Sequence, residues 1–130
     1  MSGALANVKI VLIEASLDMR NMMVKILRDQ GANRLEPFNN VVPALTFLKE
    51  SSVDLILCEM EQSPLDGTAF AQALRSGKAG PNTQTPLLLT AADNDMARIK
   101  EAIAAGASNI LLRPYSAADL VKRVRKLANR

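Results

Sequence analysis

The sequence alternates short apolar runs with longer segments that have the hydrophobic spacing of amphipathic helices. Most of the runs are rich in Val, Ile and Leu, which is typical of buried strands. A chain that alternates in this way folds into a parallel sheet, because each parallel crossover needs its own helix. The predicted strands are Val8–Ile13, Arg34–Phe38, Val53–Cys58, Pro86–Leu89 and Asn109–Leu112.

Five helices are expected after these strands, with limits set by residues that favour helix caps and helix ends. The first helix runs from the cap Ser16 to Gly31, and the second begins at the cap Asn40 with Pro43 in its first turn. The third covers Thr68–Arg75, and the fourth runs from the cap Asp93 through Ile99 and Ile103 to Gly106. The last begins at Ser116, which forms a capping-box-like start with Asp119. The first helix has five apolar residues on one face, which we expect in the core: Met19, Met22, Met23, Ile26 and Leu27.

The order of the strands in the sheet follows from how apolar each one is. The first, third and fourth strands are the most apolar, so we place them in the centre, where both faces are buried. Pro37 cannot donate to a strand ladder, which places the second strand at an edge. The fold prediction is therefore α/β: a doubly wound, five-stranded parallel sheet of order 2-1-3-4-5 with five helices, forming one domain over residues 1–130.

Two acids follow the third strand, within the stretch VDLILCEMEQSPLDG. In open parallel sheets the chemistry lies in the crevice outside the carboxyl ends of the strands, and Glu59 and Glu61 fall there. The adjacent Cys58 is the single cysteine, and inside a strand we interpret it as a small core residue rather than a reactive thiol. These acids are the first candidates for a functional site.

Composition excludes several classes of protein. The chain has no His and one Cys, so zinc is not expected. It lacks an apolar run of about 18 residues that could span a membrane, and its first residues lack the pattern of a signal peptide, so we expect no membrane partner and a cytoplasmic location. No Ser/His/Asp or Cys/His set and no glycine-rich phosphate loop is present, which argues against an enzyme.

Positive charge gathers at the C-terminal end. The segment after residue 112 has six Lys and Arg against Asp119, whereas the rest of the chain is slightly acidic. The last helix is predicted to carry a basic stripe on its outward face, made of Lys122, Arg123, Arg125, Lys126 and Arg130. This stripe is either a solvated face or a site for phosphate groups. DNA is not expected, because the remaining chain is acidic and aromatic residues for stacking are few.

Four blocks of sequence, in order along the chain, resemble the receiver domains of bacterial two-component response regulators, which have the flavodoxin-like, CheY-like fold. They are KIVLIEASLDMR, DLILCEMEQSPLDG, PLLLTAAD and GASNILLRPYS. Such domains take a phosphoryl group from a histidine kinase onto an aspartate at the end of the third strand, using a divalent metal held by two acids after the first strand. A hydroxyl after the fourth strand and a lysine after the fifth contact the phosphoryl group.

The sequence departs from this family pattern where the chemistry occurs. Glu59 stands at the position of the acceptor aspartate, Ala15 replaces the acid that directly ligates the metal, and Glu14 keeps the other acidic position. Magnesium needs near-octahedral oxygen ligands, so we expect no magnesium at this site. A glutamate carboxylate also lies one methylene further out, which misplaces it as a nucleophile. The resemblance therefore implies a degenerate receiver, or pseudo-receiver.

Three further positions belong to the same pocket. Arg113 stands for the lysine, Thr90 is the expected hydroxyl residue, and Ile110 replaces the aromatic residue that usually reorients on activation. We expect Arg113 to pair with Glu59 near Thr90, and the family implies a cis bond between Arg113 and Pro114. Three interpretations stay open: a locked state in which Glu59 mimics the phosphoryl group, drift in an unused pocket, and residual phosphorylation.

Two function classes compete. The first is a pseudo-receiver that binds another signalling protein without phosphorylation, through the family's output face of fourth helix, fifth strand and fifth helix, near Arg98, Glu101, Ile110 and Lys122. The second is an effector in which the basic last helix binds a phosphate-bearing small molecule such as a cyclic dinucleotide.

Overall fold

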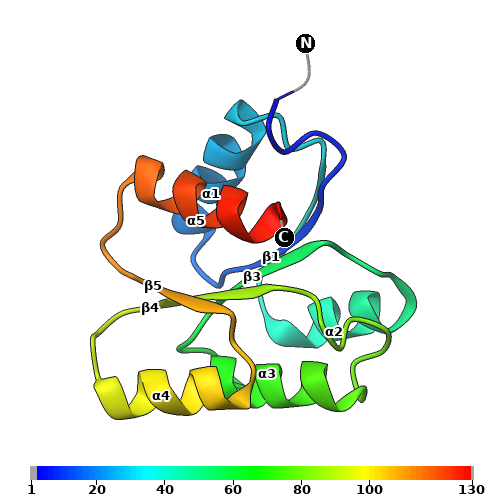
Figure 1. The fold of residues 1–130 in the computed structure, drawn as a ribbon, viewed down its shortest axis with the longest axis vertical. Helices are drawn as coiled ribbons and strands as arrows, with labels where there is room; N and C mark the ends of the chain where they lie inside the picture. The colour runs from blue at the N-terminus through cyan, green and yellow to red at the C-terminus, as the bar shows by residue number, and fades with distance from the viewer. Residues whose placement is uncertain (1–2, 130) are drawn as a thin grey trace.

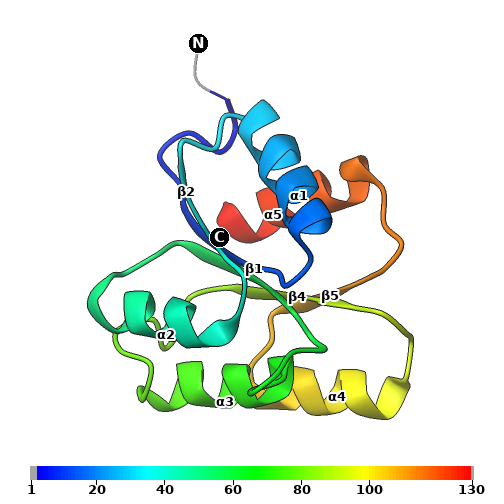
Figure 2. The same ribbon diagram turned by 180° about the vertical axis from the view of Figure 1, so that it is seen from behind.

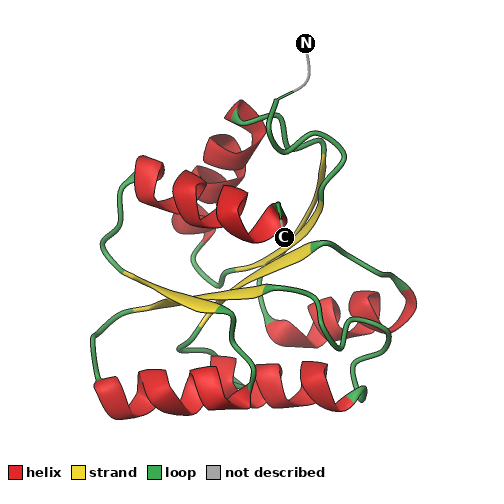
Figure 3. Ribbon diagram, in the orientation of Figure 1, coloured by secondary structure: helices red, strands yellow, loops and turns green. Residues whose placement is uncertain are grey.

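The computed structural model describes residues 3–129, in which five strands and five helices alternate along the chain (Figure 3). Every strand is followed by a helix, as the alternation of patterns predicts. The elements are β1 Lys9–Ile13, α1 Leu17–Asp29, β2 Arg34–Phe38, α2 Val41–Glu50, β3 Leu55–Glu59, α3 Gly67–Ser76, β4 Leu87–Ala91, α4 Met96–Ala105, β5 Asn109–Leu112 and α5 Ala117–Ala128.

The strands form one parallel sheet in the order β2-β1-β3-β4-β5, which confirms the predicted topology. All residues of β3 and β4 are buried, and β2, which contains Pro37, lies at an edge. β3 and β4 begin later than predicted, at Leu55 and Leu87, and they also end later, at Glu59 and Ala91. They end later because the backbone ladder continues through a polar pair in which Glu59 lies opposite Thr90. The ladder depends on backbone groups, so the change from apolar to polar side chains does not end it.

Helices cover both faces of the sheet: α1 and α5 lie on one face, and α2, α3 and α4 on the other (Figures 1 and 2). Successive strand residues point to opposite faces, so each strand contributes to two cores. Ile10 and Leu12 of β1 join the cluster under α1 and α5, whereas Val11 and Ile13 join the cluster above α2, α3 and α4. The N-terminal segment also takes part, because Leu5 is fully buried in the α1/α5 cluster.

The helix caps follow the sequence in most places. Ser16, Asn40 and Ser116 accept backbone hydrogen bonds at the starts of α1, α2 and α5, as predicted. The cap of α4 is a correction: it is Asp95, whose Oδ1 accepts from the N–H groups of Ala97 and Arg98, and not Asp93. The Asp93 carboxylate instead accepts from the Asp95 N–H at 3.1 Å, which forms a turn just before the helix.

The apolar stripe of α1 is narrower than predicted. Met23 and Leu27 are buried and Met19 and Ile26 are half-buried, but Met22 is 53% exposed. Adjacent residues of a helix point about 100° apart, so only one of Met22 and Met23 can face the sheet squarely.

Two polar side chains hold the loops at the amino end of the sheet and around α3. Asn82 is buried; its Nδ2 donates to the carbonyls of Leu48 and Ser51, and its Oδ1 accepts from the N–H of Val53. Arg75 of α3 donates to carbonyl oxygens in the loop before β4 and in the turn before β5, as described below. No helix within residues 3–129 is both long enough and apolar enough to cross a membrane.

Candidate functional site

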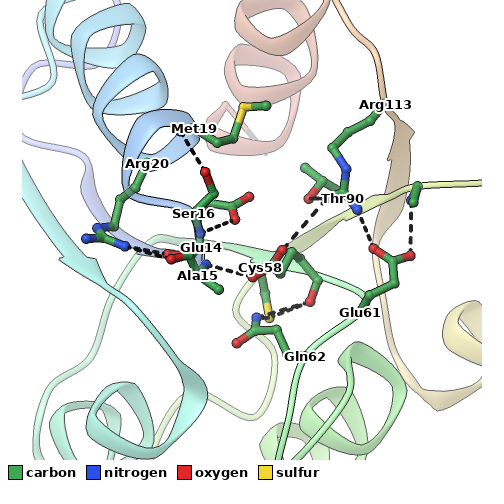
Figure 4. Close-up of polar contacts among 12 residues, drawn as sticks. Glu14, Ala15, Ser16, Met19, Arg20, Cys58, Glu61, Gln62, Thr90 and Arg113 are labelled. Atoms are coloured by element: carbon green, nitrogen blue, oxygen red, sulfur yellow. Dashed lines mark hydrogen bonds and ion pairs between the residues drawn. The ribbon is translucent and has the colours of Figure 1, made fainter.

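The residues at the predicted pocket come together at the carboxyl ends of four strands (Figure 4). Glu14 follows β1, Glu59 ends β3, Thr90 lies in β4, and Arg113 follows β5. Because parallel strands end at the same edge of the sheet, residues far apart in the sequence become neighbours there. A cavity of about 180 Å³ at this edge is lined by Glu14, Ser16, Met19, Glu59 and Arg113.

Glu14 is buried and binds the start of α1. Its Oε2 accepts from the Ser16 N–H at 2.9 Å, and its carbonyl oxygen accepts from Nη1 of Arg20 at 2.8 Å. Backbone N–H groups at a helix start are otherwise unsatisfied, and a carboxylate there is favourable. The acid at this position therefore anchors α1 to the end of β1.

Glu59 is only 8% exposed, and its carboxyl group leans toward β1. Its Oε1 accepts from the Ala15 N–H at 2.7 Å. The pKa of Glu59 is raised to about 7, mainly by burial, and the neighbouring Glu14 contributes to the rise by charge repulsion and by hydrogen bonding between the two carboxyl groups. The Ala15 hydrogen bond and the charge of Arg113 oppose this pKa rise without cancelling it. At neutral pH a large share of the Glu59 carboxyl groups is therefore protonated.

The candidate metal ligands at this edge are few. Glu14 and Glu59 supply two carboxyl groups, and the Ala15 side chain is a methyl group with no donor atom. Within residues 3–129 no cluster of three or more His, Cys, Asp or Glu side chains is placed to hold a metal ion. Each of the two carboxyl groups also has one oxygen engaged by a backbone N–H.

Arg113 approaches Glu59 as predicted, but its nearer partner is another acid. Nη1 of Arg113 lies 4.0 Å from Glu59 Oε2 and donates to Thr90 Oγ1 at 3.1 Å. Nη2 of Arg113 forms an ion pair and hydrogen bond with Glu61 Oε1. Figure 4 shows Arg113 directed toward Thr90 and Glu61, on the side of the site opposite Glu14. The Arg113–Pro114 peptide bond is cis, as the family resemblance implies.

Glu61 is the residue whose contact the sequence did not predict. Its second oxygen, Oε2, accepts from the Ala92 N–H at 3.0 Å, so one side chain from the β3–α3 loop contacts both the end of β5 and the β4–α4 loop. The sequence places Glu61 at the correct edge of the sheet, but it has no signal for the direction of a side chain in a loop.

Cys58 and Gln62 form a small buried contact behind the site. Burial raises the pKa of the Cys58 thiol well above its usual value, and Gln62 Nε2 donates to the Cys58 Sγ at 3.1 Å and to the Glu59 carbonyl. A thiol with a raised pKa is a poor nucleophile. Gln62 Oε1 is buried and has no hydrogen-bond partner among the described residues.

The predicted output face exposes apolar side chains next to charged ones. Met96 and Ile103 of α4 are 59% and 52% exposed, and Leu112 of β5 is also exposed. Arg98, Glu101 and Lys122 are exposed on the same elements. Ile110, at the predicted switch position, is half-buried against the α2/α3/α4 cluster.

The predicted basic stripe of α5 divides into separate groups. Lys122 and Arg125 line a groove of about 600 Å³ between α1 and α5, together with Ile26 and Val121. Lys126 lines a different cavity, beside the turn that precedes β5. Arg123 turns to the edge of the sheet, where Nη1 donates to Asn109 Oδ1 at 3.0 Å and to the Ile110 carbonyl at 2.8 Å. Arg130 lies outside the described residues.

Comparisons with known proteins identify relatives over nearly the whole chain. A family model described as "Response regulator receiver domain" matches residues 10–125. The chemotaxis protein CheY-3 of Vibrio cholerae serotype O1 is 25% identical over 124 residues, which cover 95% of this chain and 94% of that protein.

Solved structures give the same fold. The chemotaxis response regulator CheY4 of Vibrio cholerae has a TM-score of 0.83 at 22% identity, covering 92% of this chain and 98% of that one. The receiver domain of the sensor histidine kinase PA1611 from Pseudomonas aeruginosa PAO1, solved with a magnesium ion coordinated in its active-site cleft, has a TM-score of 0.83 at 20% identity, covering 96% and 100%. At these identities the two structures show the shared fold alone.

Proposed function

Because the chain belongs to the response regulator receiver domain family, we propose that it acts in two-component signal transduction as a pseudo-receiver, which binds a protein partner without being phosphorylated. In this proposal the protein is a binding module and not an enzyme. The carboxylates at the carboxyl edge of the sheet take the role that the phosphoryl group has in the family, with Glu59 at the acceptor position.

The observation that carries this proposal is the hydrogen bond from the Ala15 N–H to Glu59 Oε1, at 2.7 Å. Ala15 stands at the position of a metal ligand in the family, and Glu59 stands at the position of the acceptor. The backbone N–H of Ala15 therefore binds the carboxylate that would have to attack phosphorus. A protonated carboxyl is a weak nucleophile, and the pKa of Glu59, raised to about 7 mainly by burial, keeps a large share of this group protonated at neutral pH.

We also propose that the site does not use magnesium. The ion needs close to six oxygen ligands in fixed geometry, and in proteins it is usually held by one or two carboxylates that leave several places for water. Glu14 Oε2 and Glu59 Oε1 each accept a backbone hydrogen bond, and Ala15 contributes no side-chain ligand. Phosphoryl transfer depends on charge neutralisation by the metal, so this loss supports a phosphorylation-independent role.

Intact-mass measurement after incubation with acetyl phosphate and magnesium tests the proposal. We expect the wild-type protein to gain no stable phosphoryl mass. The double variant Ala15→Asp with Glu59→Asp should begin to gain this mass, whereas each single change should have little effect. A phosphorylated wild-type protein would contradict the proposal, and circular dichroism of each variant controls for loss of fold.

The proposed partner surface is the face formed by α4, β5 and α5. The apolar side chains of Met96, Ile103 and Leu112 lie exposed on it, among charged residues. Exposed apolar groups that are rimmed by polar residues are typical of protein interaction sites. A partner that is another signalling protein fits this mixed surface.

A matched pair of substitutions tests this surface. Ile103 of α4 and Val42 of α2 are 52% and 53% exposed, and both are β-branched residues on helix surfaces. Ile103→Glu should abolish capture of a partner from the native cytoplasm, while Val42→Glu should leave it intact. Equal capture by both variants would place the partner surface elsewhere on the molecule.

A second candidate function is binding of a phosphate-bearing small molecule, such as a cyclic dinucleotide. The groove of about 600 Å³ between α1 and α5, lined by Lys122 and Arg125, favours it, because ligand sites commonly have volumes of about 300–1,000 Å³. Calorimetric titration with cyclic dinucleotides tests this candidate. Heat that is lost in the double variant Lys122→Ala, Arg125→Ala would support it, and the absence of heat at low salt would exclude it.

A further inference from the structure

Helix α4 has little of its surface packed in the core. Ala102 is its one buried residue, and the larger apolar side chains Met96 and Ile103 are more than half exposed. Burial of large apolar side chains is what usually fixes a helix on a sheet. The position of α4 therefore depends on its contacts with α3 and on the contacts at its two ends.

The carboxyl end of α4 is fixed by one long polar side chain. Arg75 of α3 donates from Nε and Nη2 to the carbonyl oxygen of Gly106, at 3.0 and 2.8 Å, and Gly106 is the cap of α4. Arg75 also donates to the carbonyls of Thr83 and Thr85, at 3.1 and 2.7 Å, in the loop before β4. This end is therefore joined to α3 and to the core.

The loop that leads from β4 into α4 is held by another long polar side chain, that of Glu61. The Ala92 N–H, in the loop between β4 and α4, donates to Glu61 Oε2 at 3.0 Å. The other oxygen of Glu61 pairs with Nη2 of Arg113, while Nη1 of Arg113 is held by Thr90 Oγ1. A fixed guanidinium and a backbone N–H thus converge on one carboxylate, an arrangement suited to any small oxyanion.

Glu61 fits these donors better than Glu59 does. Glu59 Oε2 lies 4.0 Å from Nη1 of Arg113, and Glu59 Oε1 is bound to the Ala15 N–H on the other side of the site. Both oxygens of Glu61, in contrast, are used by the donors from β5 and from the β4–α4 loop.

We propose that Arg113 and the Ala92 N–H form an oxyanion site that the chain fills with its own Glu61, and that this internal ligand fixes the amino end of α4 without phosphorylation. Glu61 is then a positioning residue for the α4 surface. The expected effect of Glu61 on partner binding rests on the proposed function above. Its effect on the position of α4 is a property of the isolated chain.

Hydrogen exchange followed by mass spectrometry measures this effect directly. In Glu61→Ala, peptides that cover Ala92–Ala105 should exchange at least about tenfold faster than in the wild type, because their amides open locally when the helix start is released. Peptides from α1 and α5 should exchange at wild-type rates. Glu61→Gln keeps an oxygen for the Ala92 N–H but loses the ion pair, so its rates should be intermediate. The matched control is Glu50→Ala, because Glu50 is an exposed acid at the end of α2.

Acetate distinguishes an oxyanion site from a simple structural contact. Glu61→Ala lacks the CH₂–COO⁻ group of the side chain, which acetate supplies, so acetate should return the exchange of the α4 peptides toward wild-type rates. Chloride at equal ionic strength should not do so. The proposal is overturned if Glu61→Ala leaves exchange in α4 unchanged, or if acetate and chloride act alike. Should Glu61→Ala not fold, the isosteric Glu61→Gln carries the test, and wild-type exchange in its α4 peptides overturns the proposal.

Capture of a protein partner by the Glu61→Ala variant is measured separately. If Glu61→Ala speeds exchange in α4 and also weakens partner capture, the internal ligand and the α4 surface are both supported. If exchange in α4 rises while capture is unchanged, the internal ligand stands and the partner surface proposed above fails.

Discussion

Replacing Glu59 with glutamine tests whether the burial of this carboxyl group destabilises the folded protein at neutral and higher pH. Glu59 is 8% exposed, lies beside Glu14, and has a pKa of about 7 in the folded protein, against an ordinary value of 4.5. Between these two values the folded protein holds a proton that the unfolded chain has released. The free energy of unfolding must therefore fall as the pH rises through this window.

The size of the effect follows from the two pKa values. One pKa unit corresponds to about 1.4 kcal/mol, so the rise from 4.5 to about 7 costs about 3 kcal/mol of stability once the pH exceeds 7. Glutamine is neutral at every pH and keeps an oxygen that can accept from the Ala15 N–H. The Glu59→Gln variant should therefore match the wild type in stability at pH 4.5 and exceed it by about 3 kcal/mol at pH 8.

Urea unfolding followed by circular dichroism at several pH values from 4.5 to 8 measures this difference, since the chain has no Trp for fluorescence. Subtracting the wild-type curve from the variant curve removes the contributions of the other titrating groups. Glu50→Gln, at an exposed acid, is the matched control. A Glu59→Gln difference that stays flat with pH, or that favours the wild type at pH 8, would refute the reasoning.

Three further substitutions test the contacts that hold the fold around the site. Arg75→Ala should lower the free energy of unfolding by about 2–4 kcal/mol, because it leaves carbonyl oxygens of Gly106 and of the loop before β4 without donors. Urea unfolding measures this loss, and Arg75→Lys should recover only part of it. Asn82→Ala should cost about 2–4 kcal/mol for the same reason, visible as a lower midpoint in thermal unfolding. Leu5→Ala should cost about 2–5 kcal/mol as a core cavity, and an unchanged urea midpoint would show that the N-terminal segment does not pack in the core.

Much of the fold was predictable from local patterns. The strand order, the edge position of β2 and the caps Ser16, Asn40 and Ser116 agree with the structure, because apolar period and cap chemistry act over a few residues. Strand-end geometry placed Glu59 and Glu61 at the carboxyl edge of the sheet, and the family resemblance implied that Glu14, Thr90 and Arg113 lie there as well.

Local patterns gave less guidance where two similar residues lie close together. Asp93 and Asp95 are both good helix caps, and the backbone path of the β4–α4 loop selects Asp95. Met22 and Met23 both fit the apolar spacing of α1, and the position of the sheet buries only Met23. In each pair the sequence gives the same signal twice, and the packing of distant segments decides between the two residues.

The same holds at the site itself, where the sequence alone determined that acids follow β3 and that an arginine follows β5. Glu59 and Glu61 are two residues apart, and each could pair with Arg113 by charge. Only the tertiary structure turns Glu59 toward the Ala15 N–H and Glu61 toward Arg113 and Ala92. Likewise, the helical spacing of α5 gives Arg123 an outward position, but a long guanidinium side chain reaches back to Asn109 and Ile110 of β5. Sequence spacing fixes where a Cα atom lies on its helix or strand. The partner of a long charged side chain depends instead on which donors and acceptors the other strands and loops bring within its reach.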